Sequence, residues 1–508
     1  EYMQRRVRTL PPEATIRELS EVILGARQRL APIVEKGETI GVVTRTDLIN
    51  IFARESGNMP ESSRMDAKQW NVARLIDERL SEDKRRILRL AGEIGESLGL
   101  PVYAVGGFAR DLLAGFTSHD IDLVAEKDGL ALARELAREL GGRVREHEKF
   151  KTAVVIYHDE TGEERHIDVA TARLEYYEYP AALPTVEVSS IKMDLFRRDF
   201  SINAMAVRLD SEHYGQVEDF FGGRRDLKDG RVRVLHTLSF VEDPTRAIRA
   251  VRFEQRYKFR IGPGTEKLIK NMLPMRLLEK LSPQRLFNEF RLLCEEETAA
   301  EALIRMDEIG ILKALNERLV LNPQKKNLLK RCKETLSWYK MLFFEEKYQP
   351  WICWFYVLAH NQNYGDASAI YDSLGLPPGR KKEITRAREQ VRALKNKLIE
   401  WQKAYELGTG KTSELRRLLK PLPLEALLYI MTFVNDIGAE KSVSRYITTL
   451  RREKPDITGH DLARLGLKPG PLFSELLELA LTAKLDGKAP NSRAQLALVK
   501  ASLKKADQ

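Results

Sequence analysis

The chain has 508 residues, 43% of them hydrophobic, so it is long enough for three or four domains that each bury a core. Its net charge of +10 favours a polyanionic partner. Its three cysteines lie far apart and near no His/Cys cluster, which argues against a disulfide framework or a zinc site. The most apolar run is too short to span a bilayer and no signal peptide is visible, so we expect a cytoplasmic protein. Because the chain starts with Glu1 rather than Met, we expect its natural start to lie further upstream.

Residues 1–58 predict a small α/β unit, with a hairpin of residues 32–34 and 40–43 followed by Thr44 and Asp47. The pattern resembles a CBS motif, and the resemblance implies that Thr44 and Asp47 contact the ribose and phosphate of an adenine nucleotide. The same residue types are ordinary helix N-caps. CBS motifs also work in pairs, and one is visible here. Residues 59–82 are largely polar and predict a linker.

The most informative stretch is 102–125, VYAVGGFARDLLAGFTSHDIDLVA, which predicts a strand, a glycine turn, a short helix and a second strand. The turn at Gly106 and Gly107 would let backbone N–H groups approach a phosphate, and Arg110 could pair with a phosphate or with a nearby aspartate. Asp120 and Asp122 are two residues apart, so in a strand they share one face. Two such carboxylates are unfavourable without a cation between them, which predicts a metal site for phosphoryl transfer.

Around this stretch the pattern predicts helices at 83–98 and 130–140 and strands at 143–148, 153–158 and 165–170. Asp168 lies on the last strand and could reach the edge that carries the other two aspartates. There it would be a third metal ligand, a general base, or an edge aspartate without a catalytic role. Residues 171–190 predict a long loop.

Residues 194–207, DLFRRDFSINAMAV, predict a helix. Arg197 and Arg198 could both reach a triphosphate, or one could be structural. Asp199 and Asn203 are four residues apart on one helix face and could bind a ribose hydroxyl or each other. Residues 219–230 predict a second glycine turn.

Residues 242–249, EDPTRAIR, predict a helix start with Asp243 as N-cap and Pro244 in the first turn. A second interpretation concerns base recognition. Asp243 only accepts hydrogen bonds and Arg246 only donates them. Such a pair fits the Watson–Crick edges of cytosine and adenine and misfits those of uracil and guanine.

The rest of the chain predicts helices, at 283–296, 299–315, 327–344, 351–360, 380–401, 413–419, 424–436 and 443–452. His460 and Asp461 predict helix caps, and Lys468 with the turn after it could touch an RNA backbone. From Arg224 to Arg285 the sequence holds 16 Lys or Arg against 7 Asp or Glu. This concentration of charge is typical of a surface that contacts a phosphate backbone.

Five motifs occur in one order: GGFARD with DID, IDVATAR, DLFRRDFSINAMAV, DFFGGRRDLKDG and EDPTRAIRAVRF. In order and spacing they resemble class II tRNA nucleotidyltransferases and bacterial poly(A) polymerases, over about residues 95–320. The resemblance implies an α/β plus all-α protein. Its polymerase-β-like head with a mixed sheet would span residues 83–240, followed by a helical neck (241–300), body (301–420) and tRNA-binding tail (421–508).

The resemblance also implies roles for individual residues. Asp120 and Asp122 would hold Mg²⁺, and Asp168 would be the third acidic position. The triphosphate would contact Gly106, Gly107 and Arg110, and the ribose and phosphates would contact Arg198, Asp199 and Asn203. The base would contact Asp243 and Arg246. Arg249 and Arg252 would hold phosphate or tRNA. Gln284, followed by Arg285, stands where many members have Glu.

The implied activity is template-independent addition of nucleotides to tRNA 3′ ends from ATP and possibly CTP. Some enzymes with CBS modules add only the terminal A, which favours A-addition. The alternatives are a full CCA-adding enzyme, a poly(A) polymerase, and a non-catalytic protein that binds RNA or senses adenylates.

Overall fold

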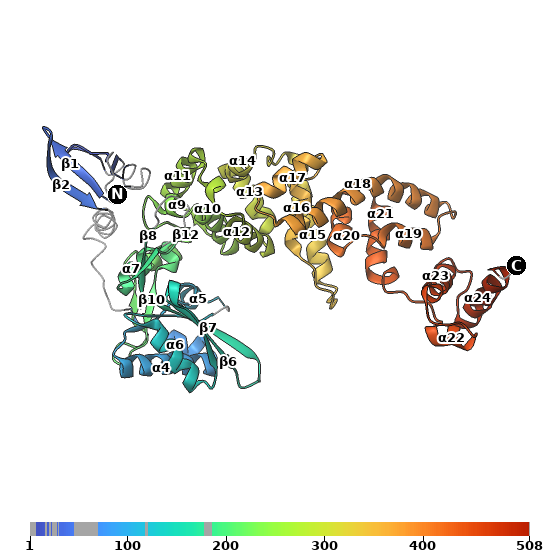
Figure 1. The fold of residues 1–508 in the computed structure, drawn as a ribbon, viewed down its shortest axis with the longest axis horizontal. Coiled ribbons are helices and arrows are strands. Elements are labelled where there is room, and N and C mark those ends of the chain that lie inside the picture. The colour runs from blue at the N-terminus through green and yellow to red at the C-terminus, as the bar shows by residue number, and fades with distance from the viewer. Residues whose placement is uncertain are drawn as a thin grey trace, which may run out of the picture. The chain divides into compact units, whose positions relative to one another are not determined.

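The computed structural model describes residues 7–15, 18–19, 22, 28, 30–44, 70–116, 120–176 and 185–506. The chain divides into two compact units (Figure 1). The first comprises Glu1–Glu289 and Glu308–Ala314, and the second comprises Phe290–Asp307 and Leu315–Gln508.

Near the N-terminus, strands β1 (Leu30–Glu35) and β2 (Glu38–Thr44) pair antiparallel. This confirms the predicted hairpin, whose turn contains Gly37 at φ +89°. Thr44 ends β2, and Asp47 lies outside the described residues.

A seven-stranded sheet organises the first unit, in the order β11-β10-β3-β4-β7-β6-β5. Strand β4 pairs parallel with β7, and the other neighbours pair antiparallel, so the sheet is mixed. The strands are β3 (Val102–Val105), β4 (Asp122–Ala125), β5 (Arg143–His147), β6 (Thr152–His158), β7 (Glu164–Thr171), β10 (Ala206–Arg208) and β11 (Val217–Glu218).

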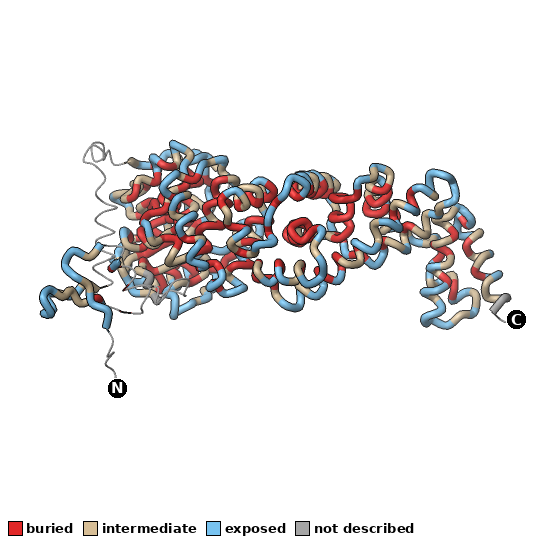
Figure 2. The backbone as a smooth tube through the Cα atoms, turned by 90° about the horizontal axis from the view of Figure 1, so that it is seen from above, coloured by how far each residue is buried: buried red, intermediate tan, exposed pale blue. Residues whose placement is uncertain are grey.

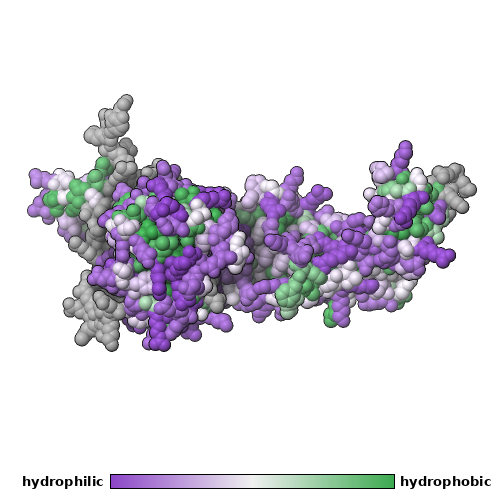
Figure 3. All heavy atoms as spheres, turned by 90° about the horizontal axis from the view of Figure 1, so that it is seen from below, coloured by the Kyte–Doolittle hydropathy of each residue, from purple (hydrophilic) through white to green (hydrophobic). Residues whose placement is uncertain are grey.

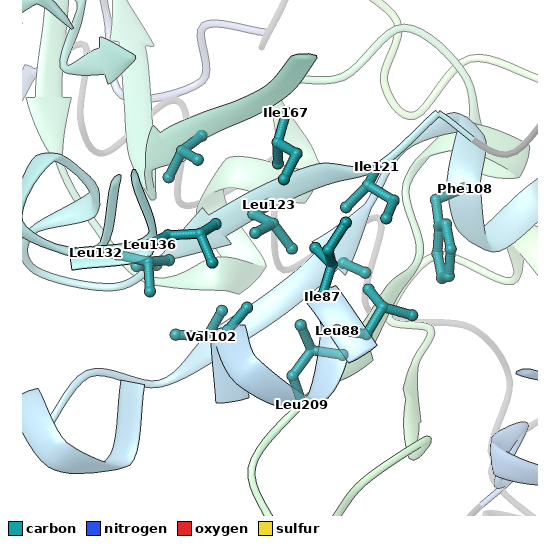
Figure 4. Packing of buried hydrophobic residues seen from close by; sticks show 14 of the residues in the cluster. Ile87, Leu88, Val102, Phe108, Ile121, Leu123, Leu132, Leu136, Ile167 and Leu209 are labelled. Atoms are coloured by element: carbon teal, nitrogen blue, oxygen red, sulfur yellow. The ribbon is translucent and has the colours of Figure 1, made fainter. Parts of the chain in front are cut away.

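Alternation along the strands gives the sheet two apolar faces. One face packs under α4 (Glu82–Leu98) and α6 (Gly129–Glu139), and the other packs against α7 (Ile191–Phe196). Figure 4 shows sheet residues of the first face, among them Val102, Leu123 and Ile167, close to the helix residues Ile87, Leu88, Leu132 and Leu136. Because Leu123 points to this face, its neighbour Asp122 points to the other.

The linker predicted over residues 59–82 ends earlier than expected. Its first part, up to residue 69, lies outside the described residues. From there the chain forms α3 (Ala73–Arg79), and Val72, Ile76 and Leu80 are buried in the core of the head. This short helix carries few apolar residues, so it shows little periodicity in the sequence.

Two further predictions were wrong. The stretch 171–190 is not a plain loop, because β8 (Arg173–Tyr176) and β9 (Thr185–Val188) pair as an antiparallel hairpin. Residues 194–207 are not one helix either: α7 ends at Phe196 and a 3₁₀ turn follows at Ser201–Asn203. Between them Phe200 is extended and bridges to Val234, so a tertiary pairing overrides helix propensity.

Short helices complete the first unit. They are α5 (Gly107–Ala114), α8 (Gly223–Lys228), α9 (Ser239–Glu242), α10 (Thr245–Arg256), α11 (Pro263–Met272) and the start of α12 (Pro283–Glu295), with β12 (Arg231–Val232) paired to β13 (Arg260–Ile261).

The C-terminal part is helical, as predicted. Its helices are α13 (Ala299–Ile309), α14 (Ile311–Leu315), α15 (Pro323–Lys340), α16 (Pro350–Leu358), α17 (Tyr364–Ser373), α18 (Pro378–Glu406), α19 (Thr412–Leu419), α20 (Leu424–Phe433), α21 (Ile437–Arg445) with a π-helical turn (Tyr446–Leu450), α22 (Gly459–Arg464), α23 (Pro471–Leu485) and α24 (Ser492–Ala506). The single run predicted at 299–315 is divided in two, because Gly310 has φ +96°. Every residue from Trp351 to His360 is buried, and Figure 2 shows such buried runs within the helical unit.

Thr458 and Asp461 form a capping box at α22, which confirms Asp461 as a cap. Among the described residues no helix is long and apolar enough to cross a membrane, and hydrophilic residues cover most of the face drawn in Figure 3.

Candidate active site

The predicted glycine turn joins β3 to α5. Gly106 has φ +68° and ψ −129°, a backbone conformation that residues other than glycine rarely adopt. A Cβ atom on Gly106 would lie 2.9 Å from Arg198 Nη1 and 3.4 Å from Asp122 Oδ2. The turn therefore lies directly against a guanidinium and a carboxylate that come from other elements.

The aspartates gather beside this turn. Asp122 begins β4, and its register partner in the parallel strand β7 is Asp168. Both point away from the face that carries Leu123. Asp120 is exposed and precedes β4, so the prediction that it shares the strand with Asp122 was wrong. Burial raises the pKa of Asp122, Arg198 lowers it, and Asp168 and Asp120 raise it, so that the pKa lies at about 6. A carboxylate this poorly neutralised fits a bound cation.

This donor set fits Mg²⁺, which does not require a closed cage of protein ligands. Among the described residues no three His, Cys, Asp or Glu side chains already stand close enough to hold a metal. Mg²⁺ is commonly held by one or two carboxylates together with substrate phosphates and water. Asp120 and Asp122 match that pattern.

Arg110 is buried and fixed in place. Its Nε donates to Asp111 Oδ1 at 2.8 Å, and its Nη1 donates to Asn203 Oδ1 at 2.6 Å. Its guanidinium carbon lies 4.6 Å from the centre of the Tyr257 ring. Asn203 Nδ2 in turn donates to Asp199 Oδ1 at 2.9 Å, so the side-chain contact predicted for that pair is present without the predicted helix.

Asp199 is clamped by Arg249. Nε and Nη2 of Arg249 both donate to Asp199 Oδ2, at 2.9 and 2.6 Å. Burial would raise the pKa of Asp199, but Arg249 and Asn203 hold it at about 2. Arg249 Nη1 also donates to Glu289 Oε1 at 3.1 Å, and the two carboxylates raise the pKa of Arg249 although burial opposes this.

Arg197 and Arg198 share the fully buried Asp194. Arg197 donates to its Oδ1, and Arg198 Nη2 donates to Oδ2 at 3.0 Å. Burial would raise the pKa of Asp194, but the two arginines lower it. Arg198 Nε is buried and has no hydrogen-bond partner among the described residues. A donor left unsatisfied beside a glycine turn fits an anionic ligand such as a phosphate.

Asp243 and Arg246 lie at the start of α10. Asp243 Oδ1 accepts from Thr245 N at 3.0 Å and contacts Arg285 Nη2 at 2.9 Å. Because α10 begins at Thr245 with Pro244 as its N-cap, Asp243 lies one position before the predicted cap and accepts from the first helical N–H. Arg246 donates from Nη1 to Ser239 Oγ at 2.7 Å and from Nη2 to a backbone carbonyl at 2.6 Å. Capping does not exclude base recognition, because both side chains also line a cavity.

That cavity has a volume of about 370 Å³. The predicted residues that line it are Gly106, Gly107, Arg110, Asp122, Arg197, Arg198, Asp199, Asn203, Asp243, Arg246 and Arg249. Asp120, Asp168 and Arg252 are not among its lining residues; Arg252 is buried, with Nη2 3.8 Å from Glu289 Oε2.

Three lining residues escaped the sequence-based prediction: Thr245, Phe253 and Glu289. A signal for Glu289 was available, because in α12 it interrupts the apolar stripe of Leu286, Phe290 and Leu293. A lone carboxylate at such a position needs a cationic partner, which Arg249 supplies.

Three parts of the chain match models of known protein families. Residues 102–233 match the family model described as poly A polymerase head domain, residues 1–54 match the CBS domain, and residues 258–320 match the probable RNA and SrmB-binding site of polymerase A. The A-adding tRNA nucleotidyltransferase of Halalkalibacterium halodurans is 32% identical over 435 residues, which are 83% of this chain and 93% of that protein. The chain belongs to the tRNA nucleotidyltransferase family. This confirms the family and the CBS-containing N-terminus that the sequence indicated.

Another tRNA nucleotidyltransferase, the A-adding enzyme of Geobacter sulfurreducens, is 39% identical over 498 residues. These are 96% of this chain but 56% of that protein, so the chain spans about half the length of that relative. A CCA-adding enzyme in its apo form is 33% identical, with a TM-score of 0.70, over 85% of this chain and 99% of that one. The Thermotoga maritima CCA-adding enzyme complexed with tRNA is 32% identical, with a TM-score of 0.67 and the same coverage. The predicted fold class is thereby confirmed.

Proposed function

We propose that this chain catalyses template-independent transfer of nucleotides to the 3′ end of tRNA, with a preference for adding the terminal A from ATP. One observation carries the proposal: the glycine turn, Asp122, Asp243 and Arg246 line a single cavity. Phosphate-binding and base-reading groups thus face one space. The preference for A rests on the relatives named A-adding, which align with 83% to 96% of this chain.

The proposed reaction is in-line attack of the RNA 3′-hydroxyl on the α-phosphate, with pyrophosphate as leaving group. Asp120 and Asp122 would hold Mg²⁺, with Asp168 beside them as a third ligand or as general base. When bound, Mg²⁺ would lower the pKa of the attacking hydroxyl and neutralise developing charge. Asp120, Asp122 and Asp168 would fix the geometry of the metal-binding end of the site.

The triphosphate would meet the N–H groups at Gly106 and Gly107 and the guanidiniums of Arg198 and Arg197. Arg198 brings a buried Nε without a partner among the described residues. Asp199 and Asn203 are already oriented by their own hydrogen bonds, so binding a ribose would require little rearrangement.

Base choice would depend on Asp243 as acceptor and Arg246 as donor, a pair that accepts cytosine and adenine. The same property keeps a full CCA-adding enzyme as second candidate, and so does the similarity to CCA-adding structures. The proposed partners are therefore tRNA, ATP and possibly CTP, and the proposed location is the cytoplasm.

The test is incorporation of labelled AMP or CMP into three RNAs: tRNA ending in CC, tRNA lacking CCA, and an unrelated RNA. Addition of one A to the first substrate alone is the expected result. Use of CTP on the second substrate would establish CCA-addition. Long A-tails on the unrelated RNA would establish a poly(A) polymerase.

Joint replacement of Asp120 and Asp122 by Ala should abolish incorporation and leave tRNA binding intact, and chelation of Mg²⁺ should do the same. Retained incorporation would refute the metal assignment. If the wild-type protein binds tRNA but incorporates nothing, the non-catalytic alternative holds.

A further inference from the structure

The helical unit contains a polar cavity outside the candidate active site. Two hollows of about 250 and 120 Å³ share Gln324, His360 and Asn361 as lining residues. They lie at the start of α15 and at the turn that follows α16. Of the described residues that line them none is acidic, whereas four are cationic: Arg318, Lys325, Arg331 and Lys395.

Lys325 is the least expected of these. Its side chain is only 7% exposed, and within the described part of the chain its ammonium makes no hydrogen bond or ion pair. Burial lowers the pKa of Lys325, and Asp307 offsets this only partly. Asp307 lies closer to Lys326, with 3.4 Å between the ammonium and the carboxylate. A buried ammonium without a partner is costly, and an anion in the cavity would remove that cost.

Lys395 is a second ammonium that pairs with no carboxylate among the described residues; it lies 5.6 Å from the centre of the Phe433 ring. The guanidiniums of Arg331 and Arg318 do have carboxylate partners, at 3.0 and 2.8 Å. The positive potential of the cavity therefore comes mainly from the two lysines.

Neutral donors complete the lining. Burial and nearby cations, Lys395 first among them, lower the pKa of His360 to about 4, so its imidazole is neutral at pH 7. Its Nδ1 lies 2.7 Å from the Tyr429 hydroxyl. The N-terminal turn of α15 adds the positive end of an 18-residue helix.

We propose that this cavity binds a phosphate group, held by the ammoniums of Lys325 and Lys395 and by the amides around them. Two point charges among several neutral donors, without an acidic lining residue in the described part of the chain, suit a multivalent oxyanion. The phosphate has two possible sources: free pyrophosphate, or a phosphodiester of bound RNA. The RNA source rests on the proposed function, whereas the pocket itself does not.

The experiment compares Lys325→Met, Lys395→Met and the double variant with Lys330→Met. Lys330 is an exposed residue of the same helix and lines neither hollow, so it is a matched control. Pyrophosphate binding is measured by calorimetry without divalent cations. Binding of a tRNA ending in CC is measured by fluorescence anisotropy over a range of salt concentrations.

If the source is RNA, each pocket substitution should reduce the slope of log K against log salt by about one, with no change in Lys330→Met. If the source is free pyrophosphate, one binding event should vanish in the pocket variants while the RNA slope stays constant. Either result supports the pocket.

The proposal is overturned if the folded double variant matches Lys330→Met in both measurements. If Lys325→Met fails to fold, the less buried Lys395→Met decides by the same criteria. AMP incorporation by the wild-type protein tests the proposed function separately, since its absence would leave the pyrophosphate result valid.

Discussion

Replacing Gly106 by Ala probes the geometry of the active-site turn. At φ +68° and ψ −129° an alanine backbone is strained, at a cost of about 1–3 kcal/mol. The new Cβ would lie 2.9 Å from Arg198 Nη1, whereas ordinary contact begins at 3.4 Å, so the guanidinium must retreat by about 0.5 Å. Because Arg198 is also hydrogen-bonded to Asp194, we expect that movement to disturb the proposed phosphate end of the site.

Gly141→Ala is the matched control. Gly141 has φ +62°, and a Cβ there would meet nothing within 4 Å, so the substitution carries backbone strain alone. Urea unfolding should show both variants destabilised by about 1–3 kcal/mol. Steady-state AMP incorporation should fall about 10- to 100-fold in kcat/KM for Gly106→Ala only, since small misplacements of positioning groups are costly. If Gly106→Ala keeps the activity of Gly141→Ala, the proposed role of the turn is wrong.

Three further substitutions test the role of Asp243 in nucleotide choice and the contributions of His360 and Arg388 to stability. Asp243→Ser keeps an acceptor for Thr245 N at the start of α10 but removes the carboxylate, so the melting temperature should stay near wild type. Discrimination of ATP against GTP should fall about tenfold or more, and unchanged discrimination would leave Asp243 with a structural role only. The pKa of His360 is about 4 in the folded protein and 6.5 in the unfolded chain, so protonation at acidic pH favours unfolding. The stability that depends on the neutral imidazole is therefore fully present above pH 6.5 and is lost as the pH falls. Wild type should lose about 2 kcal/mol between pH 7 and 5 that His360→Gln does not lose, and parallel urea curves for the two would contradict this. Arg388→Met should lower the free energy of unfolding in urea by about 3 kcal/mol, because the fully buried guanidinium donates to the carbonyls of Ala359 and Gln362. Arg386→Met, at an exposed position of the same helix, is the control, and equal losses of stability in the two variants would refute the reasoning.

Local patterns predicted the backbone around the proposed phosphate site. The described part of residues 102–125 forms the expected strand, turn, helix and strand, because glycine turns and β-branched runs act over short distances. The expected meeting of Asp168 with Asp122 depends on strand register, and the parallel pairing of β4 with β7 provides it.

Non-local contacts explain the failures. Phe200 leaves the helix predicted at 194–207 because it bridges to Val234, and no pattern within the segment shows that partner. The hairpin β8–β9 was overlooked because each strand alternates over only four residues. Glu289 was overlooked because its partner Arg249 lies 40 residues earlier in the chain.

The two halves of the site are joined by buried polar groups rather than by apolar packing alone. Arg246 donates to the carbonyl of Arg197, and Arg249 clamps Asp199, so α10 is fastened at two points to the segment that follows α7. Each contact buries a charge, and a buried charge tolerates little displacement before its partner is lost. A shift of α10 would therefore move the proposed base-reading pair and Asp199, the proposed ribose contact, together. We expect nucleotide choice to depend on the position of this helix as much as on the identity of Asp243 and Arg246.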